Sequence, residues 1–141
     1  MKTKDTDDLQ AELTDSATLT DFLRENQEMF IDDTFSDMLR ELFRKSGLSK
    51  AALAKRAGTS EVYLYQLFSG ERTPSRDRAI CLCYGLGATL EETQELLRRS
   101  RLAQLYVKDR RDAIIIYGLL HQTGLDEIND RLFEEHEVTL C

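Results

Sequence analysis

The sequence predicts an all-α protein, and three of its features lead to that prediction. A single proline and seven glycines among 141 residues leave little turn chemistry for a many-stranded sheet. Residues with high helix propensity, such as leucine, glutamate, arginine and alanine, are abundant. In several segments apolar residues recur at i, i+3, i+4 and i+7, which is the spacing of one helix face. At this length we expect one compact domain with a small appendage.

The first part of the chain is acidic and weakly patterned. Residues 1–17 are expected to form a flexible acidic tail, because a polar segment without periodicity cannot repay the entropy of ordering. Residues 18–33 are predicted to form a short helical segment whose apolar side carries Phe22, Leu23 and Phe30.

Residues 34–100 carry the clearest helical signals. Ser49 and Ser60 are placed as N-caps, and Gly47, Gly58 and Gly70 as helix stops. Together with the capping box of Thr89 and Glu92, they divide this region into five helices. The predicted helices begin near residues 35, 50, 61, 76 and 90.

Residues 101–141 are predicted to form an antiparallel helical hairpin packed on the preceding region. Its first helix, 109–121, holds too many apolar residues for one stripe, so we expect it to be covered on two sides and broken by Gly124. The second helix is expected to turn Ile128, Leu132 and Phe133 inward. Three roles stay open for this hairpin: a dimer face, an effector module, or a lid on the core.

Charge is strongly segregated along the chain. The net charge of -7 hides a central block, residues 34–111, with 15 basic and 9 acidic side chains, between two acidic flanks. A basic block is one electrostatic signature of a nucleic-acid-binding domain, although any helical protein also has charged solvated faces.

Several functional classes find no support in the sequence. It contains no phosphate-cradling glycine loop, no HExxH motif and no metal-binding spacing of cysteines, so we predict neither an enzyme nor a cofactor or metal site. No apolar run approaches the ~18 residues of a membrane span, so no membrane partner is expected. The three cysteines are interpreted as reduced thiols of a cytoplasmic protein.

The landmarks of the central region occur in a specific order. They are Gly47-Leu48-Ser49, Leu53-Ala54, Ala57-Gly58, Ser60, Leu64, Leu67, Gly70, Pro74-Ser75 and Leu86-Gly87. In this order and spacing they resemble the Xre-type, phage lambda repressor-like helix-turn-helix family, over about 55 of the 141 residues. The resemblance implies a five-helix domain whose recognition helix, residues 61–69, enters the DNA major groove.

The resemblance also implies roles for individual residues. At 100° per residue, Leu64, Leu67 and Phe68 face inward, and Glu61 and Tyr63 are expected at exposed first-turn positions. The expected base contacts are Glu61, Val62, Tyr65 and Gln66. The expected contacts to the DNA backbone are Ser49, Lys50, Ser60, Ser69, Arg72 and Arg76.

Two departures from the family pattern carry their own expectations. Glu61 stands where relatives often have glutamine, and it either accepts from a cytosine amino group or only stabilises the helix N-terminus. Phe43 and Phe68 occupy positions where relatives often place an ion pair, and we expect the two rings to touch instead. Tyr63 and Tyr65 either contact DNA or pack on neighbouring helices.

These observations predict a DNA-binding transcriptional regulator of bacterial or phage type, located in the cytoplasm. Its partner would be double-stranded DNA, and a homodimer is expected because one module grips few base pairs. A protein partner could also bind through the C-terminal hairpin. The alternative is a protein-interaction module that keeps the fold and does not bind DNA.

Overall fold

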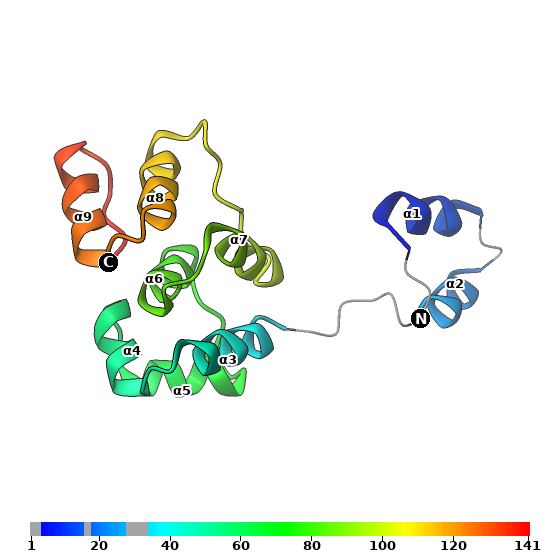
Figure 1. Cartoon of the computed structure of the whole chain (residues 1–141). Coiled ribbons are helices and arrows are strands. Elements are labelled where there is room, and N and C mark those ends of the chain that lie inside the picture. The colour runs from blue at the N-terminus through cyan, green and yellow to red at the C-terminus, as the bar shows by residue number, and fades with distance from the viewer. Residues whose placement is uncertain (1–3, 16–17, 28–33) are drawn as a thin grey trace. The chain divides into compact units, whose positions relative to one another are not determined.

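The computed structural model describes residues 4–15, 18–27 and 34–141. In these ranges the regular elements are helices and none is a strand, so the prediction of an all-α fold is confirmed. The chain divides into two units, Met1–Asp32 and Asp33–Cys141, which we describe separately (Figure 1). Within the described ranges, no helix is both long enough and apolar enough to cross a membrane.

The N-terminal unit contains a helix where the sequence pattern predicts a tail. Helix α1 spans Thr6–Asp15 and buries no residue, so apolar periodicity could not have indicated it. Its start is stabilised locally, because the backbone N–H of Asp8 donates to the Asp5 carboxylate over 2.7 Å. Acidic side chains in the first turn also suit the helix dipole. The prediction that residues 1–17 form a flexible tail is therefore wrong for residues 6–15, which form a helix.

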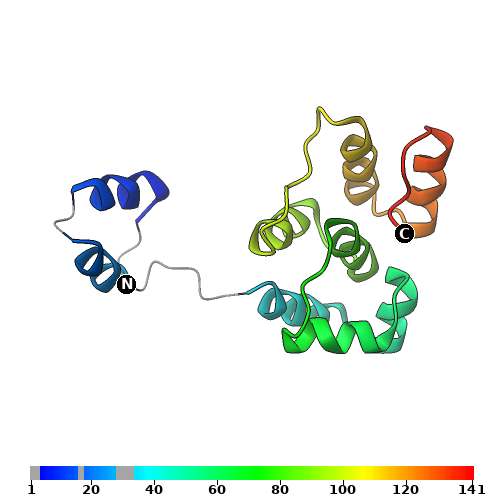
Figure 2. The same cartoon turned by 180° about the vertical axis from the view of Figure 1, so that it is seen from behind.

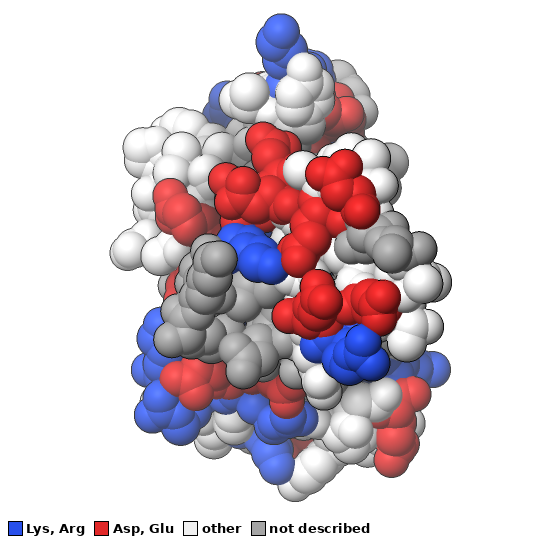
Figure 3. Space-filling model, turned by 90° about the vertical axis from the view of Figure 1, so that its right-hand side faces the viewer, with Lys and Arg blue, Asp and Glu red and all other residues white. Residues whose placement is uncertain are grey.

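Helix α2, Leu19–Glu25, is the short helix expected in this unit, and the Thr18 side chain caps it. Phe22 is buried as expected, Leu23 is 44% exposed, and Phe30 lies outside the described residues. The Lys4 ammonium links the two helices by donating to Glu12 over 2.7 Å and to the side chain of Asn26 over 2.6 Å. Figure 3 shows a group of neighbouring acidic side chains in red.

The second unit begins with five helices that match the sequence prediction closely. They are α3 (Phe35–Ser46), α4 (Lys50–Ala57), α5 (Glu61–Ser69), α6 (Arg76–Leu86) and α7 (Leu90–Arg99). Ser49 and Ser60 cap α4 and α5 as predicted, each accepting the backbone N–H three residues ahead. Thr89 and Glu92 form the expected capping box of α7.

Helix α6 is the centre of this unit. Every residue from 79 to 85 is buried, because α6 contributes to two cores. Leu82 and Cys83 pack with α3, α4 and α5, whereas Ile80 and Tyr84 pack with the C-terminal helices. As a result, α5 lies on the outer side of the unit and the C-terminal helices lie on the opposite side of α6 (Figures 1 and 2).

The C-terminal helices α8 (Arg110–Leu120) and α9 (Leu125–Glu134) form a hairpin, and two details of it differ from expectation. Helix α8 is covered on two sides as expected, because Ile115 and Leu119 are buried in a core shared with α6, α7 and α9, while Leu120 is 61% exposed. Phe133, expected inward, is 76% exposed, whereas Ile128 and Leu132 are buried. The left-handed residue after α8 is Gln122 (φ 55°), and Gly124 instead begins α9.

Candidate nucleic-acid interface

The exposed side of α5 is defined by which of its residues the core takes up. Leu64 and Leu67 are fully buried, as the helical spacing predicts, whereas Val62 is 67% exposed and Tyr65 55% exposed. Glu61 and Ser69 are also exposed, and Gln66 is half-buried. Of the four expected base contacts, three therefore project into solvent, and Gln66 lies at the edge of the exposed face.

The turn between α4 and α5 fixes how the two helices meet. It consists of Gly58, Thr59 and Ser60, and Gly58 adopts a left-handed conformation (φ 66°) that a residue with a β-carbon rarely adopts. The backbone N–H of Thr59 donates back to the carbonyl of Ala54 over 2.9 Å, which closes the end of α4. This short, hydrogen-bonded connection holds the N-terminus of α5 close to the C-terminus of α4.

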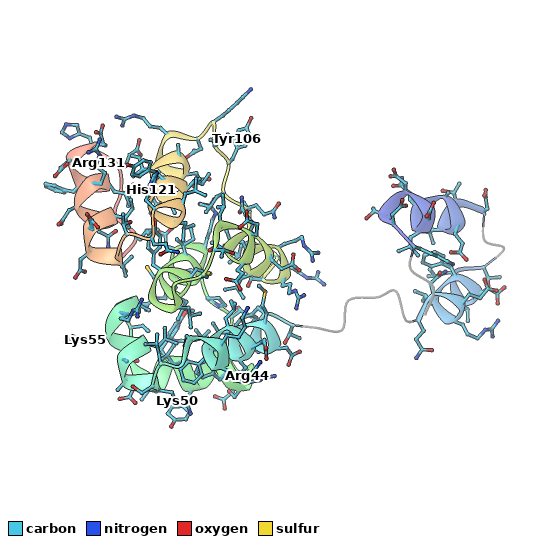
Figure 4. All side chains as sticks on the ribbon, in the orientation of Figure 1. Arg44, Lys50, Lys55, Tyr106, His121 and Arg131 are labelled. Atoms are coloured by element: carbon cyan, nitrogen blue, oxygen red, sulfur yellow. The ribbon has the colours of Figure 1, made fainter. Side chains whose placement is uncertain are left out.

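Lys50 and Tyr65 lie against each other across the two helices. The Lys50 ammonium is 3.9 Å from the centre of the Tyr65 ring, a cation–π distance. Figure 4 shows Lys50 projecting from the edge of the unit where α4 and α5 lie, away from Tyr106 and Arg131. A residue expected to contact phosphate and a residue expected to contact bases thus share one surface.

The three serines expected to contact the DNA backbone differ in whether their hydroxyl protons are free to donate to a phosphate. The hydroxyl oxygens of Ser49 and Ser60 accept capping hydrogen bonds from Ala52 and Tyr63, each over 3.1 Å. Their hydroxyl protons are therefore available to a phosphate oxygen. The Ser69 hydroxyl instead donates to the Gln66 carbonyl over 3.1 Å, so its proton is already used. Ser69 does not fit its expected role.

Tyr63 is not at an exposed position, contrary to the prediction. It is only 8% exposed, and two guanidinium groups lie over its ring, with the Arg78 carbon 4.8 Å and the Arg72 carbon 5.4 Å from the ring centre. Burial raises the pKa of Tyr63, while the positive charges of Arg78 and Arg72 oppose that rise. The sequence reasoning missed Arg78, which lies in α6 but reaches Thr59 in the turn before α5 over 3.4 Å.

Arg76 differs from Arg72 and Arg78, because its guanidinium is bound by other residues of the protein. Its guanidinium makes two hydrogen bonds to the carboxylate of Asp112, at 2.8 and 3.1 Å, and a third to the Ala103 carbonyl at 2.9 Å. Asp112 is only 6% exposed, and its hydrogen bonds raise the pKa of the Arg76 guanidinium. Arg76 thus joins α6 to α8, and its charge is already neutralised, so it does not fit the expected phosphate contact.

The remaining cations sort by whether they have a carboxylate partner. The α3 cations Arg40, Arg44 and Lys45 are all ion-paired. Among the described residues, the cations near α4 and α5 that have no ion pair are Lys50, Lys55, Arg56, Arg72 and Arg78. Three of them lie against tyrosine rings of α5, Lys50 over Tyr65 and Arg72 and Arg78 over Tyr63. Lys55 and Arg56 instead line a pocket with residues of the C-terminal helices. We call the side chains of Lys50, Val62, Tyr65, Arg72 and Arg78 the α5 surface.

Two departures from the family pattern concern Phe43 with Phe68, and Glu61. The Phe43 and Phe68 rings do touch, with centres 5.1 Å apart and planes tilted by 40°. Glu61 is exposed in the first turn of α5, a position that suits the helix dipole. In the part of the chain that the structure describes, no three potential ligands come close enough to hold a metal ion.

Comparison with known protein families identifies the class of the central region. The model of a family described as "Helix-turn-helix domain" matches residues 34–96, which extend from the cap of α3 into α7. No curated protein and no solved structure matches the chain. Residues 34–96 therefore form a helix-turn-helix domain, a class generally associated with DNA-binding regulators. The hairpin of α8 and α9 lies outside the match.

Proposed function

We propose that this protein is a sequence-specific, DNA-binding transcriptional regulator of the lambda repressor-like, Xre type, and that α5 is its recognition helix. The observation that carries the proposal is the α5 surface, where exposed Val62 and Tyr65 lie among cations without ion pairs. Positive charge without a protein partner is what neutralises phosphates and releases counterions. In this arrangement the protein acts by binding and is not an enzyme.

The proposed contacts use the hydrogen-bonding groups and charges that are not already bound within the protein. Base edges would be read by Glu61, Val62, Tyr65 and Gln66, with Gln66 able to pair with adenine and Val62 able to meet a thymine methyl group. Phosphates would be bound by Lys50, Arg72 and the hydroxyls of Ser49 and Ser60, with Arg78 added. Ser69 and Arg76 are left out, because their donors are used within the protein.

Duplex binding as a function of salt tests this proposal. Three cationic contacts per protomer, made by Lys50, Arg72 and Arg78, predict a slope of log affinity against log salt of about -3 per protomer. Selection of bound sequences from random duplexes would give the preferred site, and fluorescence anisotropy on that site would give the slope. No binding at low salt, or a slope near zero, would contradict DNA binding.

The same experiment addresses the second candidate, a protein-interaction module. The exposed carboxylate of Glu61 at the front of α5 is the observation that favours this candidate, because it would repel phosphate. If α5 enters the groove and Glu61 reads a base, Glu61→Gln should change the preferred base at one position of the site. If duplex DNA does not bind to either form, the protein-interaction module becomes the better explanation.

We further propose that the protein acts as a cytoplasmic homodimer. One module contacts few base pairs, and two-fold symmetric sites call for two. The hairpin supplies exposed apolar side chains for a second copy, with Tyr117 59% and Leu120 61% exposed on α8. Sedimentation equilibrium of the wild type and of Leu120→Ser tests this. A wild-type monomer at micromolar concentration would favour a different protein partner for the hairpin.

A further inference from the structure

Two cysteines far apart in the sequence meet at the junction of α6 and the end of the chain. The sulfurs of Cys81 and Cys141 are 2.9 Å apart. Cys81 is 2% exposed and faces the core formed with the hairpin, whereas Cys141 is exposed to solvent. The contact therefore joins a buried cysteine to an exposed one.

The segment that carries Cys141 is held in place on two sides. On the α9 side, the Leu140 backbone N–H donates to the Asn129 side chain over 2.7 Å, and Asn129 donates to the Cys141 carbonyl over 3.3 Å. On the α6 side, Arg111 donates to the Val138 carbonyl over 2.8 Å. Arg111 also forms two 3.0 Å hydrogen bonds to Asp77 of α6. The contact between the two sulfurs is thus supported by neighbouring hydrogen bonds and an ion pair.

We propose that Cys81 and Cys141 form an oxidation site at which a peroxide produces a disulfide that links α6 to the end of the chain. Cys141 is the residue that reacts first, because it is the exposed one of the pair. Burial raises the pKa of Cys81, so Cys81 is a protonated thiol, the less reactive form toward peroxide. Disulfides of proteins in reducing compartments are usually transient and redox-sensing, and this site fits that class.

The chemistry balances with hydrogen peroxide as the oxidant. The Cys141 sulfur attacks one peroxide oxygen, the O–O bond breaks, and the products are a Cys141 sulfenic acid and one water. The Cys81 sulfur then attacks the Cys141 sulfur, the S–O bond breaks, and the hydroxyl leaves as a second water with the Cys81 proton. The two thiols lose two electrons and two protons, and the peroxide gains both.

The third cysteine provides a matched control on the same helix. Cys83 lies two residues from Cys81 and so faces the other core of α6, where it is fully buried. Desolvation raises the pKa of Cys83 to about 12, which keeps it an unreactive thiol. Oxidation of the native protein should therefore spare Cys83.

The test is peroxide treatment of the folded full chain, followed by alkylation in denaturant and mass spectrometry. Before treatment all three thiols should be labelled, and afterwards only Cys83, with one peptide pair joined through Cys81 and Cys141. Cys83→Ala should leave this link intact and Cys141→Ser should abolish it. In the urea-unfolded chain, the preference for this pair over the two others should be lost.

Three results would overturn the proposal. They are retention of all three labels, oxidation of Cys141 to a sulfinic acid with Cys81 still free, and a link between Cys141 residues of two chains. Thermal unfolding is an independent readout, since closing a loop of this length should raise the Tm of the oxidised wild type by up to about 10 °C. The Tm of Cys141→Ser should not respond to peroxide, and an unchanged wild-type Tm would count against a link formed in the native fold.

Discussion

Replacing Lys50 and Arg76 separately by alanine distinguishes a DNA contact from a structural ion pair. Both residues are cations near helix N-termini, and from the sequence alone both are expected to bind phosphate. In the structure the Lys50 ammonium lies over Tyr65 on the exposed side, whereas the Arg76 guanidinium is bound to Asp112. We therefore expect Lys50→Ala to weaken DNA binding and Arg76→Ala to lower the stability of the fold.

The expected magnitudes follow from these contacts. Loss of one phosphate contact at Lys50 should make the salt slope shallower by about 0.9 per protomer, with little change in stability. Arg76→Ala removes two hydrogen bonds from the buried Asp112 carboxylate, which keeps one from the backbone N–H of Tyr106 at 3.0 Å. Because Arg76 is itself partly exposed, we expect a loss of about 2 to 3 kcal/mol, below the range for a fully buried pair.

Fluorescence anisotropy across a salt series and urea unfolding measure the two effects on the same samples. Circular dichroism would establish that Arg76→Ala is folded at the temperature of the binding assay. Asp112→Asn is the matched control, since it should also lower stability without changing the salt slope. If Arg76→Ala were stable and had a shallower slope, or if Lys50→Ala had an unchanged slope, the division made here between the two cations would be refuted.

Three further predictions concern base reading, packing and pH. Gln66→Ala should relax the preference for one base at a cost of about 1 to 3 kcal/mol, and an unchanged preferred sequence in a selection experiment would remove α5 from its proposed role. Phe43→Ala should cost about 2 kcal/mol in urea unfolding, less than for a fully buried ring because Phe43 is half-buried. Phe133→Ala, at a position 76% exposed, should stay within about 0.5 kcal/mol as the control. Hydrogen bonds from Arg98 and Arg99 lower the pKa of Glu95 from 4.5 to about 2. The stability that Glu95 contributes is therefore present above pH 4.5 and is lost as the pH falls towards 2, and a Glu95→Gln variant should lose less stability over that interval.

The helices of the second unit were predictable because their boundaries depend on neighbours in sequence. Ser49, Ser60 and Thr89 each accept a backbone N–H three residues ahead, and Gly47 and Gly58 each adopt the left-handed conformation after a helix. Helix α1 escaped prediction because it buries nothing and its start is stabilised by a single carboxylate at Asp5. Pattern reasoning detects apolar stripes, and α1 has none to detect.

The sequence by itself determined the helical class, most of the helix boundaries and the outward position of Val62 and Tyr65, because each depends on contacts within one turn of helix. Only the tertiary structure decided which cations have no carboxylate partner and which two thiols are in contact. Arg76 is neutralised by Asp112, 36 residues away, and Cys81 meets Cys141, 60 residues away. Arg78 reaches the turn before α5 only because α6 packs against α4. The periodicity of a single segment carries no information on such pairs, since they depend on how α8 and the end of the chain fold back onto α6.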